Sequence, residues 1–174
     1  MTDAQTIAPL QRFESSHRYD AMNQISLSPA EAAIVTGVMP ATQRDWRHRA
    51  LLSASSDGWT RFDPQGLAEL SLLKILAAKG RMTEGSEAAR ALAGPLGRYF
   101  AASAGGESAP VPTDVAVIWA DGSVGVSSSI QGAFDAATVE QQSGPMTVLT
   151  LEVLAVPLWI RLRAFLQEEG ELVQ

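Results

Sequence analysis

The first half of the chain alternates between apolar residues at helical spacing and short runs of turn residues. The stretch from 26 to 37 predicts a helix, because Ser28 and Glu31 have the spacing of a capping box and a proline occupies the first helical position between them. Gly37 ends this helix, since glycine tolerates the left-handed conformation of a tight exit. Pro40 can begin a second helix a few residues later. Two short helices joined by a turn that contains glycine are the pattern of a helix-turn-helix.

The chain after this pair predicts one turn-rich segment and two further helices. Residues 53–63 contain an Asp-Gly pair followed by aromatic residues, which predicts a small β-hairpin. Leucines recur at helical spacing from 64 to 80, so a helix with an apolar face is expected there. Another helix begins near Thr83, and we expect it to break at Gly94-Pro95, because proline has no amide hydrogen to donate inside a helix.

The second half predicts strands followed by a terminal helix. Small residues and prolines at 103–112 are typical of a linker. Residues 114–129 predict two strands joined by an Asp-Gly turn, and 129–144 are ambiguous, with a short helix as one interpretation. The β-branched stretch 146–156 predicts a strand, and Pro157 opens a helix with one apolar face.

The charges of the chain are unevenly distributed. The 174 residues have a formal net charge of −6 at pH 7. Residues 1–100 carry 11 Lys and Arg against 10 Asp and Glu, whereas residues 101–174 carry 2 against 9. The second half therefore cannot attract polyanions, and any contact with nucleic acid must come from the first half.

Composition excludes several classes of protein. Hydrophobic residues make up 46% of the chain and charged residues 18%, which favours a folded core over general disorder. There is no cysteine, so disulfides, thiolate metal sites and cysteine nucleophiles are excluded. The first 25 residues lack the apolar segment of a signal peptide, and the longest apolar run is too short to span a membrane. We therefore expect a cytoplasmic protein without a membrane partner.

The stretch TQRDWRHRALL, residues 42–52, concentrates three arginines and a histidine around one tryptophan. On a helix, four of its polar side chains fall within one arc: Gln43, Arg44, Arg47 and His48. Asp45 and Arg49 are four residues apart and can pair across the helix surface. Arginine can contact phosphates or bind guanine in a bidentate fashion, and glutamine can read adenine. As the second helix of a helix-turn-helix, this segment suits the major groove of DNA.

The order of these elements resembles the winged-helix DNA-binding domain of the MerR family of bacterial regulators, over residues 26–92, roughly 40% of the chain. The second-helix pattern of that family, a threonine, an arginine, an aromatic residue and two apolar residues, is matched by Thr42, Arg44, Trp46, Leu51 and Leu52. Its wing pattern of glycine, aromatic residues and arginine is matched by Gly58, Trp59, Arg61 and Phe62. In the family, the next helix ends in a glycine after an apolar stripe, as at Gly80.

The resemblance implies a winged helix-turn-helix fold with double-stranded DNA as its partner. The helix at 41–50 would enter the major groove, and the hairpin at 53–62 would be a wing lying on the DNA backbone. Trp46 would pack and also touch the backbone, whereas Trp59 has either a core role or a role near phosphates. The residues expected to contact DNA are Thr42, Gln43, Arg44, Trp46, Arg47, His48, Arg49, Trp59 and Arg61.

The chain departs from the family pattern in two respects. The first is a set of four substitutions: Gln43 for an apolar residue, Asp45 for an aromatic residue, Ala50 for a glycine and Thr60 for a wing arginine. The second concerns dimerisation, because the family uses a long coiled coil after the DNA-binding domain. Here the stretch that follows residue 83 contains a glycine-proline pair and offers no long heptad run.

These observations predict an α+β chain, with an amino-terminal winged helix-turn-helix followed by a small α+β domain. The expected units are a flexible arm at 1–25, a MerR-like winged-helix DNA-binding domain at 26–102, a linker at 103–112 and an α+β dimerisation or effector domain at 113–174. Apolar surface left over in the last unit would favour a homodimer, and two copies double the DNA contacts. No residue pattern identifies a small-molecule effector.

The leading hypothesis is a bacterial or phage transcriptional regulator that binds specific DNA sequences and is associated with the nucleoid. A phage-type excisionase or DNA-architectural factor is an alternative, because such proteins bend DNA with similar winged helices. A protein-interaction module, such as an antitoxin or an anti-regulator, is a second alternative, since the acidic half could mask a basic partner. An enzyme is not expected: His17 and His48 are the only histidines, and we find no catalytic triad, cofactor site, metal-ligand spacing or phosphate-binding glycine loop.

Overall fold

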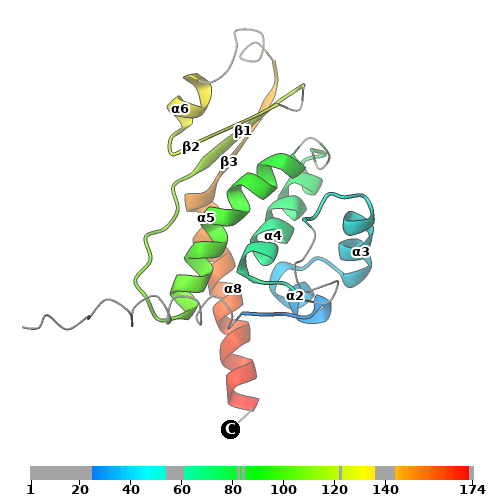
Figure 1. Cartoon of the computed structure of the whole chain (residues 1–174), viewed down its shortest axis with the longest axis vertical. Helices are drawn as coiled ribbons and strands as arrows, with labels where there is room; N and C mark the ends of the chain where they lie inside the picture. Colours follow the sequence, from blue (N-terminus) through cyan, green and yellow to red (C-terminus); the bar gives the residue numbers. More distant parts are fainter. Residues whose placement is uncertain are drawn as a thin grey trace, which may run out of the picture.

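The computed structural model of the chain describes residues 25–53, 61–81, 83, 85–121, 123–135 and 144–172. Its helices are α2 (Pro29–Thr36), α3 (Pro40–His48), α4 (Pro64–Ala78), α5 (Ser86–Ala104), α6 (Ile130–Asp135) and α8 (Leu151–Leu172). Its strands are β1 (Val115–Trp119), β2 (Val124–Ser127) and β3 (Met146–Thr150) (Figure 1). The predicted α+β class is confirmed, and so are the predicted starts of α2 at Pro29 and α3 at Pro40.

Helix α4 lies at the centre of the helical part of the molecule. It contacts α5 along its length and α2 on another side, and Figure 1 shows it between α5 and the α2–α3 pair. Leu67, Leu70, Leu72, Leu73 and Leu76 are at most 1% exposed, so the helix is apolar on nearly every side. A helix that is hydrophobic around its whole circumference must be buried to be stable.

Helices α4 and α5 approach so closely that one position in α5 requires glycine. A Cβ atom at Gly97 would lie 2.7 Å from Cα of Gln65 and 2.9 Å from its backbone nitrogen, at the start of α4. Backbone atoms cannot move aside as a flexible side chain does, so this contact depends on the absence of a side chain.

The sheet has the strand order β2-β1-β3, and β1 pairs antiparallel with both neighbours. Ala116 and Ile118 of β1 belong to the main hydrophobic core, whereas Val117 and Trp119 form a smaller cluster with Ala133 of α6. Helix α5 contacts β1 and β2, and α6 contacts the same two strands. The alternation of β1 side chains between two apolar environments explains why the whole strand is buried.

The main hydrophobic core includes side chains from both parts of the chain that the sequence separates at the predicted linker. Phe100 of α5 stacks on Trp159 of α8, with ring centroids 6.4 Å apart and an interplanar angle of 23°. Leu151 and Leu162 of α8 belong to the same cluster as the leucines of α4. Helix α8 therefore packs on the helical part as well as following the sheet.

Two prolines lie inside helices, contrary to the sequence prediction. Helix α5 is continuous through Pro95 and extends to Ala104, into the predicted linker. Strand β3 ends at Thr150, and α8 begins at Leu151 rather than at Pro157. Each proline leaves one carbonyl, four residues earlier, without its helical donor. Those residues, at positions 91 and 153, are exposed, so water can reach them and the helix survives.

The Gly97 contact gives a matched pair of substitutions within α5. Gly97→Ala should lower the free energy of unfolding by about 1–3 kcal/mol, because its methyl group meets the backbone of Gln65. Gly94→Ala should raise it by up to about 1 kcal/mol, because alanine favours a helix and its Cβ comes no closer than 3.5 Å, to Arg98. Urea unfolding of both variants measures the difference. Equal effects of the two substitutions would contradict the close approach.

Candidate nucleic-acid interface

Helix α2 begins with the capping box that the sequence predicts. The Glu31 amide donates to Oγ of Ser28 at 3.3 Å, and the Ser28 amide donates to Oε2 of Glu31 at 2.5 Å. These hydrogen bonds stabilise the carboxylate and lower the pKa of Glu31 below its ordinary value, with a smaller contribution from the charge of Arg61. At the other end, Gly37 adopts the left-handed conformation with φ 68°.

The turn between α2 and α3 is held by side-chain contacts from both sides. The Thr36 hydroxyl donates to the carbonyl of Ala32 at 2.6 Å and accepts from the amide of Val38 at 3.2 Å. Nζ of Lys74, on α4, donates to the carbonyl of Thr36 at 2.8 Å. A cation at the carboxyl end of a helix also complements the helix dipole. The exit from α2 is therefore fixed to α4.

Gln43 is the main correction to the predicted set of DNA-contacting residues. Its side chain is 1% exposed, so it does not share the outward arc that the sequence predicts. Nε2 donates to the carbonyl of Pro29 at 2.9 Å and to that of Val38 at 2.8 Å. Its Oε1 is buried without a hydrogen-bond partner among the described residues. The side chain thus joins α3 to the start of α2 and to the turn.

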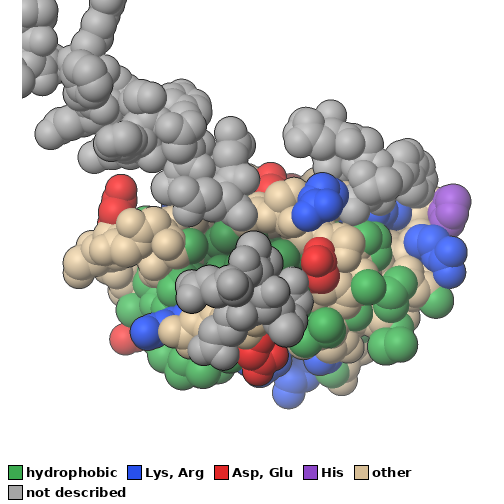
Figure 2. Space-filling view, turned by 90° about the horizontal axis from the view of Figure 1, so that it is seen from below, with side chains coloured by type: hydrophobic (Ala, Val, Ile, Leu, Met, Phe, Trp, Pro, Cys, Tyr) green, Lys and Arg blue, Asp and Glu red, His purple; other side chains and the backbone are tan. Residues whose placement is uncertain are grey.

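The outward side of α3 carries exposed charged residues. Arg44, His48 and Arg49 are exposed, and Thr42 is partly exposed. Arg49 lies 3.6 Å from Asp45, which confirms the predicted pair four residues apart. Helix α3 lies at the right of Figure 1, and Figure 2 shows Lys and Arg side chains beside a His side chain at the same end of the molecule.

The inward side of α3 includes two further residues that the sequence assigns to DNA. Trp46 is 6% exposed and belongs to the main core. Arg47 is partly buried, with its guanidinium 4.3 Å from the ring centroid of Phe62. Burial lowers the pKa of Arg47, but a guanidinium stays protonated at neutral pH. Arg47 thus joins α3 to the far end of the predicted wing.

The predicted wing is described only at its two ends. Trp59, Gly58 and the other residues from 54 to 60 lie outside the described residues. At the far end, Leu27 and Phe62 exchange backbone hydrogen bonds of 2.9 and 2.7 Å. Arg61 is exposed, and its Nε donates to the carbonyl and the hydroxyl of Ser26 at 3.1 and 2.7 Å. Arg61 therefore attaches this end to the segment before α2.

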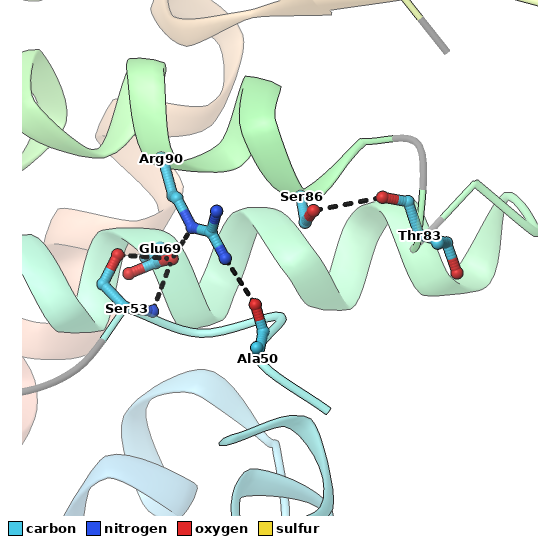
Figure 3. Close-up of polar contacts among 6 residues, drawn as sticks. All are labelled: Ala50, Ser53, Glu69, Thr83, Ser86 and Arg90. Atoms are coloured by element: carbon cyan, nitrogen blue, oxygen red, sulfur yellow. Dashed lines mark hydrogen bonds and ion pairs between the residues drawn. The ribbon is translucent and has the colours of Figure 1, made fainter. Parts of the chain in front are cut away.

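The near end of the segment is held by a buried carboxylate on α4. Oε1 of Glu69 accepts from the amide and hydroxyl of Ser53 at 2.9 and 3.0 Å (Figure 3). Arg90 of α5 lies 3.6 Å from the same oxygen and also donates to the carbonyl of Ala50. Burial raises the pKa of Glu69, while the hydrogen bonds from Ser53 and the charge of Arg90 act in the opposite direction.

Glu69 and Arg90 were not identified from the sequence as parts of this region. Glu69 is the only acid within the leucine-rich run of α4, and a lone carboxylate at a buried position needs a partner. That signal predicts a buried charge but not its partners, because Arg90 is 21 residues away in the next helix.

Ala50 stands in the left-handed conformation, with φ 54°, immediately after α3. It is the only non-glycine residue with positive φ among the described residues. A Cβ atom is strained in this conformation, so the backbone favours glycine at position 50.

Comparison with known proteins identifies no family. No protein-family model matches the chain. No curated protein matches it either. Within the described ranges, no group of three His, Asp or Glu residues could hold a metal ion. None of the helices described is both long and apolar enough to cross a membrane.

Replacing Gln43 tests its place in the interior. Gln43→Leu keeps the volume but removes both hydrogen bonds, so we expect the free energy of unfolding to fall by about 1–2 kcal/mol. Urea denaturation monitored by the circular dichroism of the helices measures the change. Gln65→Leu, at an exposed position of α4, is the control and should change stability by less than about 0.5 kcal/mol. An equally small effect at both positions would contradict the buried position of Gln43.

Ala50→Gly should stabilise the protein. Glycine relieves the strain of a positive φ, and its greater freedom in the unfolded chain offsets part of the gain, which leaves about 0.5–1 kcal/mol. Ala91→Gly, at an exposed site inside α5, should instead destabilise by about 1 kcal/mol. Thermal and urea unfolding of both variants give the signs. A loss of stability in both would show that position 50 is not left-handed in solution.

Proposed function

We propose that this protein is a transcriptional regulator that binds specific sequences of double-stranded DNA, with α3 as the helix that enters the major groove. The observation that carries the proposal is the exposed row of Arg44, His48 and Arg49 on the second helix of a helix-turn-helix. The opposite side of that helix is fixed by buried Trp46 and Gln43. A rigid helix with a cationic outer side is the arrangement that major-groove recognition requires.

The position of the cations supports this proposal despite the negative charge of the chain. Electrostatic interactions in physiological salt decay over about 8 Å, so a nearby phosphate responds mainly to the local surface. Helix α3 and its cap carry three arginines and a single aspartate, and that aspartate is paired with Arg49. The acids outside this surface therefore oppose binding less than the net charge of −6 suggests.

The residues of α3 support different roles in this proposal. Arg44 is the candidate for a base or phosphate contact, because it is exposed and forms no ion pair with the residues that the structure describes. Thr42 lies in the first turn of α3, where a hydroxyl can reach a phosphate. Arg47 and Trp46 would act mainly by fixing the helix. Gln43 has no role in base recognition in this proposal, because its amide is used inside the protein.

The segment 53–62 would serve as the wing. Its support is that both ends are anchored beside the helix-turn-helix, because Ser53 donates to Glu69 of α4 and Phe62 pairs with Leu27 just before α2. Arg61 would position the wing through Ser26 and could add a phosphate contact with the rest of its guanidinium. A contact of Trp59 with DNA stays a prediction.

A regulator of this kind would act as a homodimer. One helix-turn-helix reads only a few base pairs, and two copies on adjacent half-sites multiply the affinity. DNA binding would also associate the protein with the nucleoid.

Arg44→Ala tests the proposal directly. A duplex is first selected from random DNA with the wild-type protein, and its dissociation constant is then measured by fluorescence anisotropy at several salt concentrations. We expect the substitution to raise the dissociation constant by about tenfold or more, because one arginine contact contributes on the order of 1–3 kcal/mol. A phosphate contact would also lower the salt slope by about one, whereas a base contact would relax the preference at one position.

Arg98→Ala is the matched control, because Arg98 is also exposed but lies on α5. It should change the dissociation constant by less than about twofold, since it lies outside the helix-turn-helix. Failure to select any duplex, or equal effects of Arg44→Ala and Arg98→Ala, would rule out recognition by α3. Circular dichroism of each variant checks that the fold is retained.

A further inference from the structure

Helix α8 exposes a row of apolar side chains on the side opposite to its packed side. Its fully or mostly buried residues, which belong to the main core, are Leu151, Ala155, Leu158, Leu162 and Phe165. On the other side, Val153, Val156 and Ile160 are 69%, 41% and 60% exposed. Pro157 and Ala164 are also exposed. We call the exposed set, Val153, Val156, Pro157, Ile160 and Ala164, the α8 stripe.

The spacing of the α8 stripe makes it one continuous surface. Its members are three, four and seven residues apart, so they lie along one side of the helix. Single exposed apolar residues are common on protein surfaces, but a contiguous row on one helix is typical of a surface that associates. Figure 1 shows the carboxyl-terminal part of α8 extending beyond the other helices, and Figure 2, from below, shows many apolar side chains on that end of the molecule.

We propose that the α8 stripe binds the same stripe of a second copy of this chain, with the two helices antiparallel. The charges beside the stripe support a second copy as the occupant. Glu152 and Arg163 are both exposed and lie eleven residues apart, about three turns, so they flank the stripe on the same side. A twofold axis level with residues 157 and 158 brings Glu152 of each copy level with Arg163 of the other.

The apolar residues interleave in the same arrangement. Counted along the shared axis, Val156 and Pro157 of one copy lie between Ile160 and Pro157 of the other. Every contact occurs twice, as a twofold interface requires. The stripe is thus complementary to itself in the positions of its apolar residues and in the charges beside it.

The proline in the stripe provides a further point of complementarity. Pro157 has no amide hydrogen, so the carbonyl of Val153 lacks its helical donor. In the antiparallel arrangement, exposed Arg161 of the second copy is level with this carbonyl and can donate to it. The interface would therefore give this carbonyl a protein donor that its own helix cannot supply.

Charged substitutions in the stripe test the proposal without DNA, so the result is independent of the proposed DNA binding. Sedimentation equilibrium of the full chain should give the mass of two chains for the wild type. Val153→Glu with Ile160→Glu should give the mass of one chain at the same concentration, with the dimer dissociation constant raised on the order of 100-fold or more, because four carboxylates would be buried between the copies.

Ile34→Glu is the matched control, since Ile34 is 70% exposed on α2 and lies outside the stripe. This variant should remain a dimer. A monomeric wild type would overturn the proposal and leave the stripe for a different protein. Dissociation by Ile34→Glu, or a dimer that persists in the double variant, would place the interface elsewhere.

Introduced cysteines test the antiparallel arrangement, and the natural chain contains none to interfere. Pro157→Cys lies next to the proposed axis, where the two copies are offset by only about 1.5 Å along the helix, so oxidation should link the chains. Ile160→Cys would be offset by about 7 Å or more and should not form the disulfide. Efficient linking through Ile160→Cys would show that the helices are parallel and would overturn the arrangement.

Discussion

Burial of α4 is the constraint on which the rest of the structure depends. The helix is apolar around nearly its whole circumference, so the other elements must cover it on every side. Its few polar residues then form hydrogen bonds with specific groups on the elements that cover it. Lys74 holds the end of α2, and Glu69 holds Ser53 shortly after α3. The helix-turn-helix is thus attached to α4 at two places, through Lys74 to Thr36 and through Glu69 to Ser53.

This attachment explains how an acidic chain can present a cationic surface. The residues that fix α3, Gln43 and Trp46, point inward, and the arginines that remain on the outside do not contribute to packing. Stability and surface charge are therefore carried by different sides of one short helix. Helix α5 is packed equally closely on α4, because Gly97 approaches Gln65 at the start of α4. Since α5 also contacts β1 and β2, it connects α4 to the sheet.

Local signals predicted much of the fold, and tertiary context accounts for what they missed. The capping box at Ser28, the helix start at Pro40 and the Asp45–Arg49 pair depend on residues close in sequence. The sequence predicts helix boundaries at Pro95 and Pro157, because a proline is unfavourable in an isolated helix. Packing of α5 and α8 in the core outweighs that cost, and the residue four positions before each proline is exposed.

The candidate site shows the same limit. The sequence placed Gln43 beside Arg44 and Arg47 in an arc, since periodicity reports direction around a helix but not what lies opposite. Helix α2 determines which arc is buried, because the carbonyls of Pro29 at its start and of Val38 just after its end accept hydrogen bonds from Nε2 of Gln43. The sequence likewise predicts a strand over 146–156, but only Met146–Thr150 forms one and α8 begins at Leu151, because β-branched residues on an exposed helix face and on a strand look alike in sequence.

The position of α8 connects the two proposals physically. Helix α8 contacts α2, the first helix of the helix-turn-helix, and it contacts α5, which packs on α4. A dimer formed by the α8 stripe would therefore be joined to each α3 through packed helices, with α2 as the shortest route. The separation of the two α3 helices would be fixed by this packing rather than by a linker. Because half-site spacing on DNA follows that separation, the α8–α2 contact would determine which arrangement of half-sites the dimer can bind.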